Sequence, residues 1–318
     1  MAGPKKRVIF DHDGGVDDLL SLVLLLTMDN IDVVGVTITP ADCFLEDATE
    51  TTLKILSLFQ RSDIPVAKGD LYGVNPFHYD WRAQPKMLNA LPAILATPLD
   101  TSPLVEQSAK EFIADSIAAS AEPITVLMTG PCSNLVAAID SNKAIKDNIE
   151  QIIWMGGAVN VVGNVAMHNH DNSAEWNVYW DPFAAKRLFE LELTIKLVAL
   201  DATNCLPIDK AFLSLIAAQR HFPLSELAGQ FWATTVAAIP AYEYTYHLWD
   251  VMATSILELS EDAVQFETME LAVATTEPSQ GRTYAAPGNG QWVDVAVSAD
   301  RDKVLDYVLQ KLQRSFLT

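Results

Sequence analysis

The chain has 318 residues, 50% of them apolar, and carries 41 acidic against 21 basic residues, a formal net charge of −20. Its length is compatible with one large or two ordinary domains, and its apolar content excludes a largely disordered chain. The negative charge argues against nucleic acid or an anionic membrane as the main partner. Cys43, Cys132 and Cys205 lie far apart, without the spacing of metal ligands, which indicates free thiols in a reducing compartment.

The N-terminal segment leaves no room for a secretory signal, because the first expected strand begins at about residue 7. Pro4-Lys5-Lys6-Arg7 has the composition of a nuclear signal, although a short basic edge to a strand is more often simply solvated. No apolar stretch approaches the roughly 20 residues that a membrane span needs. We therefore expect a cytoplasmic protein with neither membrane nor nucleic acid as a partner.

Short β-branched runs alternate with helical patterns over the first two-thirds of the chain. Strands are expected at residues 7–10, 32–38, 64–67, 124–128, 151–155 and 193–199. Helices are expected between them, at residues 16–28, 48–60, 105–119, 133–139 and 182–189. This alternation predicts an α/β fold whose mainly parallel, open, Rossmann-like sheet is flanked by helices.

The last third has a different pattern. Helices are expected at residues 208–220, 224–238 and 249–259, then a β-meander at 264–274, 282–285 and 292–297, and a terminal helix at 300–314. No repeat or Pro/Gly/Ser linker divides the chain, so residues 1–318 are expected to form a single domain. The weakly patterned stretches 68–100 and 156–174 are expected to be loops that build a pocket over the strand ends.

Four aspartates fall within eight residues near the N-terminus: Asp11, Asp13, Asp17 and Asp18. An apolar strand leads into them and an apolar helical run follows, so they belong to a turn at the carboxyl end of a parallel strand, where open α/β sheets bind ligands. The helix N-terminus offsets only part of their mutual repulsion. A hard cation with oxygen ligands, such as Ca²⁺ or Mg²⁺, would offset the rest. This cluster is the expected active site.

Three interpretations compete for the cluster. An EF-hand fails, because a strand precedes the aspartates and Leu22 occupies the position where that loop needs a glutamate. A Mg²⁺-dependent phosphohydrolase of the haloacid dehalogenase type would use Asp11 as nucleophile and Asp13 as acid, and it leaves Asp17 and Asp18 without a role. In the third interpretation both pairs form one site, where one carboxylate activates water and others hold a metal and a sugar.

The segment VIFDHDGGVDD, residues 8–18, resembles the N-terminal signature of the inosine–uridine preferring nucleoside hydrolases, commonly DTDPGxDD. The resemblance recurs in family order at TGPCSN (129–134), MGGA (155–158), GNV (163–165), AEWN (174–177) and Trp249-Asp250. It covers about residues 7–260. It implies a hydrolase that cleaves the N-glycosidic bond of ribonucleosides, and a homodimer.

The resemblance also implies a metal-assisted mechanism. Asp13 would be the general base that takes a proton from a metal-bound water. The metal would be Ca²⁺, held by oxygen atoms of Asp13, Asp18, Asp250 and the backbone carbonyl of Thr129. The all-oxygen character of that set is what calcium requires. Asp11 would support the cluster from behind.

The remaining sugar contacts are implied in the same way. Asp17 and Asn177 would bind the ribose 2′- and 3′-hydroxyls, and Asp250 would face the sugar as well as the metal. Asn164 and Glu175 would hold the 5′-hydroxyl. Each of these residues alone would be an ordinary loop or capping residue in most sequences, and it is their family order that favours a shared site.

The base side departs from pyrimidine-accepting members of the family, which carry a leaving-group histidine immediately before the aspartate that matches Asp250. This chain has Trp249 there, a second tryptophan, Trp81, in an expected pocket loop, and Asp42 at a position that matches a base-contacting aspartate of one branch of the family. These features resemble the purine-specific inosine–adenosine–guanosine branch known from trypanosomes, in which two tryptophans sandwich the base. His247 is a further candidate acid for the leaving base.

The other aromatic and histidine residues have simpler interpretations. Trp154, Trp176 and Trp180 are expected in the core, and the pair His168 and His170 is not expected to bind metal. The leading hypothesis is a Ca²⁺-dependent hydrolase acting on inosine, adenosine and guanosine. A catalytically silent nucleoside- or Ca²⁺-binding protein on the same fold remains an alternative, beside the phosphohydrolase.

Overall fold

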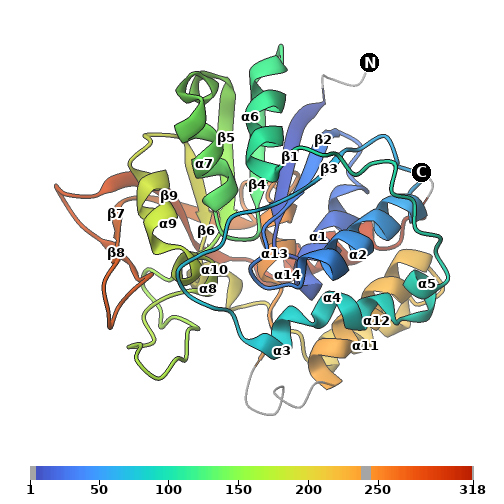
Figure 1. The fold of residues 1–318 in the computed structure, drawn as a ribbon. Coiled ribbons are helices and arrows are strands. Elements are labelled where there is room, and N and C mark those ends of the chain that lie inside the picture. Colours follow the sequence, from blue (N-terminus) through green and yellow to red (C-terminus); the bar gives the residue numbers. More distant parts are fainter. Residues whose placement is uncertain (1–4, 238–244, 317–318) are drawn as a thin grey trace.

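A computed structural model describes residues 5–237 and 245–316. Its centre is a nine-stranded sheet with the order β3-β2-β1-β4-β5-β6-β9-β7-β8 (Figure 1). The first six strands pair in parallel, β9 joins parallel to β6, and β7 runs antiparallel to both β9 and β8. The strands are β1 (Lys6–His12), β2 (Ile31–Ile38), β3 (Val66–Lys68), β4 (Ile124–Met128), β5 (Ile149–Met155), β6 (Ile195–Val198), β7 (Val264–Val273), β8 (Thr283–Ala285) and β9 (Gln291–Ala299).

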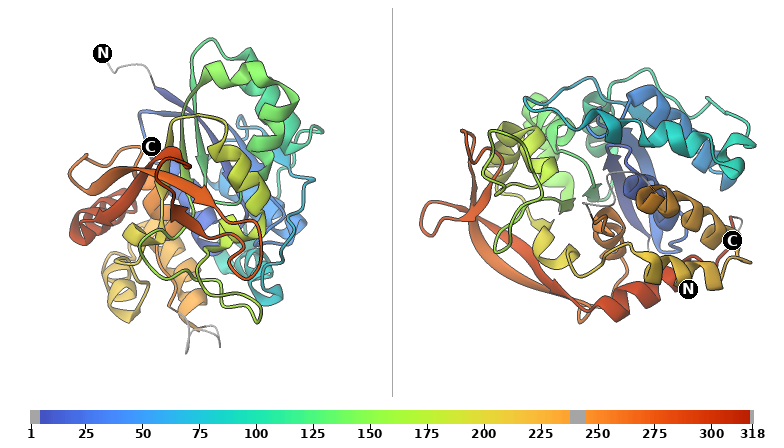
Figure 2. Two further views of the ribbon diagram at one scale, coloured as in Figure 1. Left: turned by 90° about the vertical axis from the view of Figure 1, so that its left-hand side faces the viewer. Right: turned by 90° about the horizontal axis from the view of Figure 1, so that it is seen from below.

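Helices connect the strands and cover both faces of the sheet, as the two turned views show (Figure 2). They are α1 (Val16–Leu25), α2 (Leu45–Leu58), α3 (Tyr79–Arg82), α4 (Gln84–Asn89), α5 (Pro92–Leu95), α6 (Ala109–Ala119), α7 (Ser133–Ser141), the 3-10 helix η1 (Lys143–Asn148), α8 (Trp176–Trp180), α9 (Pro182–Phe189), α10 (Leu200–Thr203), α11 (Lys210–Ala218), α12 (Pro223–Ala237), α13 (Trp249–Ser255) and α14 (Arg301–Lys311). No helix among the described residues is long and apolar enough to cross a membrane.

Two buried cores lie on opposite faces of the sheet. Val8 and Phe10 of β1 pack in the core formed with α1, α2, α12, α13 and α14, whereas Ile9 packs in the core formed with α6, α7 and α9. Successive side chains of a strand point to opposite faces, so a strand covered on both sides needs a continuous apolar run. The expected α/β fold with a mainly parallel sheet is confirmed.

The stretch 68–100 contains three short helices, α3, α4 and α5, where a loop is expected. Pro85 and Pro92 lie in the first turns of α4 and α5, where a missing N–H costs no helical hydrogen bond. Leu88 and Ile94 are fully buried in the core that includes α2. Helices of this length are too short to show a 3.6-residue period in the sequence.

The expected β-meander is wrong in its strand order, because β7 rather than β8 lies in the middle. β9 pairs with β7 from Val264↔Ala299 to Leu271↔Gln291, and its other edge pairs with β6. β8 has only three residues and pairs at the far edge of β7. A strand that closes against β6 must lie inside the sheet, and local sequence patterns do not carry that information.

Other boundaries differ less. Helix α12 ends at Ala237 in the described part, and residue 238, the last of the expected helix 224–238, lies outside the described residues. The short helices α8 and α10 are absent from the sequence expectation. Glu175 begins α8, since its carboxylate accepts hydrogen bonds from the N–H groups of Asn177 and Val178 at 2.9 and 3.3 Å. The stretch 156–174 contains neither helix nor strand, as expected for a pocket loop.

Candidate active site

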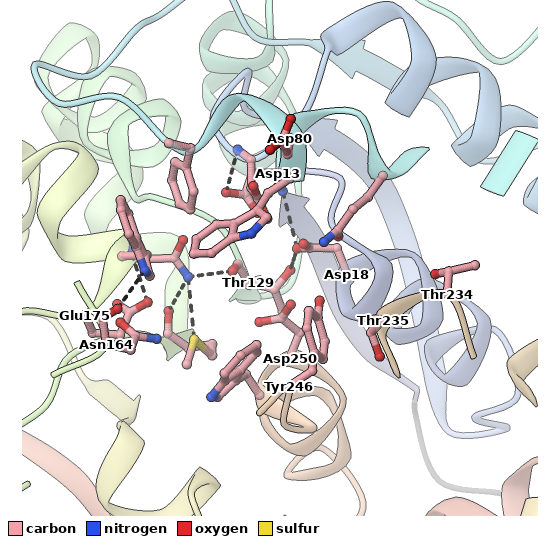
Figure 3. Close-up of a pocket in the computed structure, with 18 of the residues that line it drawn as sticks. Asp13, Asp18, Asp80, Thr129, Asn164, Glu175, Thr234, Thr235, Tyr246 and Asp250 are labelled. Atoms are coloured by element: carbon pink, nitrogen blue, oxygen red, sulfur yellow. Dashed lines mark hydrogen bonds between the residues drawn. The ribbon is translucent and has the colours of Figure 1, made fainter. Parts of the chain in front are cut away.

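A pocket with a cavity volume of about 200 Å³ opens over the carboxyl ends of β1, β4 and β5. Asp13, Asp18, Thr129 and Asp250 lie around its middle, Asn164 and Glu175 lie together on one side, and Thr234 and Thr235 lie on the other (Figure 3). The pocket therefore gathers residues that are up to 237 positions apart in the chain, between Asp13 and Asp250.

The turn after β1 is closed by Asp18. Its Oδ2 accepts a hydrogen bond from the Gly15 N–H at 2.9 Å, and its Oδ1 accepts from the Thr129 hydroxyl at 2.5 Å. Gly14 has φ +84°, and a Cβ there would lie 2.7 Å from the Cβ of Ala48, so only glycine fits. The turn thereby brings Asp18 to the end of β4.

Asp17 points away from the pocket. Its Oδ2 accepts hydrogen bonds from the N–H groups of Asp250 and Val251 at 2.6 and 3.1 Å, and its Oδ1 accepts from the Trp232 indole at 3.2 Å. The carboxylate thus binds the N-terminal turn of α13 and holds Asp250 at the pocket. Asp17 is buried and is not among the pocket-lining residues, so its contact with the ribose hydroxyls stays a prediction.

Asp11 also lies behind the pocket. Its Oδ1 accepts hydrogen bonds from the Thr37 hydroxyl at 2.7 Å and the Asn134 amide at 3.1 Å. Burial raises the pKa of Asp11 to about 7. This enclosed position suits support of the turn rather than attack on a substrate, which removes the main argument for a phosphohydrolase with Asp11 as nucleophile.

The carboxylates that line the pocket oppose one another electrostatically. Burial, followed by the charge of Asp18, raises the pKa of Asp13, Asp42 and Asp250 well above the usual range. The N–H of Asp42 donates to Asp13 Oδ2 at 3.2 Å and lowers the pKa of Asp13 in part. A cation among these groups would relieve the repulsion and favour their ionised forms.

The donor set fits a hard cation by its chemistry. The carboxylates of Asp13, Asp18 and Asp250 and the main-chain carbonyl of Thr129 supply only oxygen atoms, as Ca²⁺ prefers. Within residues 5–237 and 245–316, however, no three His, Cys, Asp or Glu side chains are already grouped closely enough to form a metal site.

The wall of the pocket that is predicted to bind the ribose is built on main-chain hydrogen bonds. Glu175 accepts hydrogen bonds from the N–H groups of Gly157 and Asn177 at 3.0 and 2.9 Å, and burial raises its pKa to about 7. The Asn177 amide donates to the carbonyl of Thr129 at 2.7 Å. The Asn164 carbonyl accepts from the Trp176 indole at 3.0 Å. The pocket thus brings Asn164, Glu175 and Asn177 to one wall.

Aromatic side chains line the pocket beside these polar groups. Trp81 packs edge-on against Trp176 with 5.2 Å between ring centroids, and Trp249 packs against Tyr246 at 4.7 Å. All four residues line the pocket. Trp176 is buried, as expected for a core residue, yet it also forms part of the pocket wall, together with Phe77, which lies 5.3 Å from it.

His247 lies outside the pocket lining. Its Nδ1 is 3.0 Å from the Thr245 carbonyl, its ring packs 5.4 Å from that of Trp249, and burial lowers the pKa of its imidazole. Trp154 and Trp180 are buried as expected. Asp42 and both predicted base-binding tryptophans, by contrast, line the pocket.

Several residues that line the pocket are not predicted from the sequence, among them Tyr246, Gln84, Met87 and the pair Thr234 and Thr235. Tyr246 belongs to an aromatic-rich segment just before Asp250, a signal that could have been used. Gln84 gives no such signal, because its role depends on α4 packing beside α1. Its Oε1 accepts a hydrogen bond from the Val16 N–H at 3.1 Å, which fixes the orientation of its amide.

Residues 8–306 match the sequence model of a protein family described as inosine-uridine preferring nucleoside hydrolase. The chain belongs to this family. It is therefore a nucleoside hydrolase, of a family that cleaves the N-glycosidic bond of ribonucleosides, and the expected family is confirmed. The match extends past residue 260, where the recognisable motifs end.

Individual relatives agree with the family assignment. The inosine-uridine preferring nucleoside hydrolase from Bacillus anthracis is similar in structure, with a TM-score of 0.88 and 34% identity, over 97% of this chain and 99% of that one. The pyrimidine-specific ribonucleoside hydrolase RihA from Salmonella paratyphi B is 28% identical over 96% of this chain and 98% of its own length. A purine-preferring ribonucleoside hydrolase from Gardnerella vaginalis shares the fold, with a TM-score of 0.80 and 23% identity over 97% of this chain and 98% of that one.

Proposed function

We propose that this nucleoside hydrolase cleaves purine ribonucleosides, namely inosine, adenosine and guanosine, to free base and ribose, with Ca²⁺ as its cofactor. Such an activity would serve purine salvage. A homodimer and a cytoplasmic location remain predictions from the family resemblance and the sequence.

The observation that supports this proposal is a single pocket lined by two chemically different kinds of group. The carboxylates of Asp13, Asp18 and Asp250 line it, and so do the indoles of Trp81 and Trp249. A ribonucleoside has the same division, with a polyhydroxylated sugar joined to a flat aromatic base. Stacking of a base on aromatic side chains contributes about 1–3 kcal/mol and favours the larger purine surface.

Asp13 is the proposed general base. Its carboxylate accepts the Asp42 N–H at 3.2 Å, which holds it at the carboxyl end of β1, facing the pocket. From there it can take a proton from the attacking water. When bound, Ca²⁺ would lower the pKa of a water molecule and orient the sugar hydroxyls.

The remaining carboxylates have an electrostatic role in the proposed reaction. Breaking the N-glycosidic bond develops positive charge on the ribosyl ring. Negative groups already fixed around that ring, including Asp18 and Asp250, stabilise the charge without having to reorganise. This role is distinct from proton transfer and needs several carboxylates, as the pocket offers.

Protonation of the leaving base favours purines over pyrimidines in this pocket. None of the described lining residues is a histidine, and Trp249 stands immediately before Asp250. A purine held between indoles can take its proton at N7 from solvent, whereas a pyrimidine needs a dedicated acid. His247 would have to turn into the pocket to supply one.

A product assay tests the proposal against its competitors. In Ca²⁺ buffer we expect ribose and hypoxanthine from inosine, loss of both with excess chelator, and recovery when Ca²⁺ is restored. Phosphate release from p-nitrophenyl phosphate with Mg²⁺, without ribose from inosine, would instead favour the phosphohydrolase. Nucleoside binding by calorimetry without product would identify the silent binder.

A further inference from the structure

The pocket loop after β5 begins at Gly157 and Ala158, which lie between the ribose wall and strand β8. The Gly157 N–H donates to Glu175 Oε2 at 3.0 Å. Gly157 has φ +78°, and a Cβ on it would lie 3.0 Å from the hydroxyl oxygen of Thr283. The main chain therefore passes close to Thr283 at the point where it supports Glu175.

Thr283, the first residue of β8, binds this segment through hydrogen bonds of its side chain. Its hydroxyl accepts a hydrogen bond from the Ala158 N–H at 2.9 Å and donates one to the Ala158 carbonyl at 3.0 Å. Thr283 and Ala158 are both almost fully buried, at 1% and 2% exposure. Without the hydroxyl, both main-chain groups of Ala158 would lose their partner in a place where water cannot replace it.

The same segment is also held by α10. The carboxylate of Asp201 accepts hydrogen bonds from the N–H groups of Val159 and Asn160 at 2.9 and 2.8 Å. Thr283 and Asp201 together fix three consecutive residues, 158–160, and the preceding Gly157 bonds Glu175 directly. Neither residue lines the pocket.

We propose that Thr283 is a positioning residue for the ribose end of the pocket, acting through Ala158 and Gly157 on the carboxylate of Glu175. This inference rests on the proposed function, in which Glu175 holds the 5′-hydroxyl of the substrate. It assigns to the C-terminal hairpin of β7 and β8, remote from the aspartate cluster in sequence, a part in recognising the sugar. Its signature is loss of preference for a substrate that has a 5′-hydroxyl.

The test compares kcat/KM for inosine and 5′-deoxyinosine in three variants. Thr283→Val keeps the shape of the side chain and removes the hydroxyl, Thr283→Ser keeps the hydroxyl, and Thr268→Val removes an exposed hydroxyl of β7 that bonds Asp294 at 2.6 Å. We expect Thr283→Val to lose about tenfold on inosine, mostly through KM, because small displacements of positioning groups are costly. Its activity on 5′-deoxyinosine should hardly change, and the other two variants should match the wild type on both substrates.

Failure of the inference and failure of the proposed function would give different kinetic results. No ribose from either substrate with wild-type enzyme, or equal kcat/KM for both, would overturn the proposed role of Glu175 and the inference with it. A wild-type preference for inosine that Thr283→Val retains, or an equal loss on both substrates, would overturn the inference alone. If Thr283→Val does not fold, Thr283→Ala removes the same hydroxyl and is compared by the same ratio of kcat/KM values, and an unchanged ratio overturns the proposal.

Discussion

Asp13 faces the pocket from the end of β1 with one oxygen bonded to the Asp42 N–H. In Asp13→Asn the amide keeps an oxygen for that bond and for a metal, but it cannot accept a proton. We therefore expect kcat for inosine to fall by about 10²–10⁴-fold, the usual contribution of a general base. Calorimetric titration with Ca²⁺ should still show binding. Unchanged turnover would remove Asp13 as the base.

Trp249 is the residue on which the proposed purine preference depends most directly. Trp249→Ala should raise KM for inosine by a factor corresponding to about 1–3 kcal/mol of lost stacking, with a smaller effect on any uridine cleavage. Trp292→Ala is a matched control, since Trp292 lies on β9 with 66% of its surface exposed. An equal loss on both nucleosides, or an effect of the same size in the control, would argue against base stacking.

The sequence predicts the chemistry of the pocket better than the orientation of each group in it. Asp13, Asp18 and Asp250 line one pocket because each follows a strand end or begins a helix there. Asp17 belongs to the same motif, yet its carboxylate turns to the N–H groups of α13. A motif places a residue near a site, whereas the direction of its side chain depends on partners far away in the chain.

At the scale of the elements, helix α13 carries Asp250 to the pocket, and Asp17 fixes the start of that helix. In Asp17→Ala, two main-chain N–H groups and one indole N–H lose their acceptor, and each buried unpaired donor costs about 1–3 kcal/mol. We expect a large drop in the free energy of urea-induced unfolding together with weaker Ca²⁺ binding.

A second helix cap is the control for that prediction. Asp209 caps α11 by accepting a hydrogen bond from the Phe212 N–H at 2.8 Å, and it is exposed. Asp209→Ala should cost about 1 kcal/mol, as cap removal usually does, and leave kcat for inosine at the wild-type value. If Asp17→Ala were no more destabilising than Asp209→Ala and bound Ca²⁺ normally, the link from Asp17 to α13 would be unimportant.

The parallel half of the fold follows from the sequence because each of its strands is a local apolar run between helices. The order β9-β7-β8 does not, since it is decided by which strand closes against β6. Helices α3, α4 and α5 also cannot be predicted from the sequence, because they are too short to show a helical period. They are stabilised instead by burial of Leu88 and Ile94 against α2. These elements carry Trp81, Gln84 and Met87, so much of the proposed base-binding surface depends on tertiary packing.

At the scale of the whole molecule, carboxylates buried in and behind the pocket oppose folding when they ionise. The pKa of Asp11, Asp17 and Glu175 is raised to about 7, from ordinary values of 3.8 for the aspartates and 4.5 for the glutamate. A folded pKa above the unfolded one favours the folded state at low pH, and this advantage disappears as the pH rises through 7.

Chelator-treated protein should therefore have a higher Tm at pH 5 than at pH 8. Added Ca²⁺ should raise Tm at pH 8 much more than at pH 5, because a cation stabilises the ionised carboxylates and binds only when they are deprotonated. Differential scanning calorimetry at the two pH values, with and without Ca²⁺, checks both statements. A metal-free Tm that is equal or higher at pH 8 would contradict them, as would a Ca²⁺ effect independent of pH.

The central claim is that this nucleoside hydrolase recognises purine bases in its pocket. The measurement that tests it most directly is kcat/KM for ribose release from inosine and from uridine, in the same Ca²⁺ buffer with the same enzyme preparation. The account predicts efficient release from inosine and little from uridine. Equal release from both, or a preference for uridine, would contradict it and direct attention to His247; the RihA relative is named pyrimidine-specific.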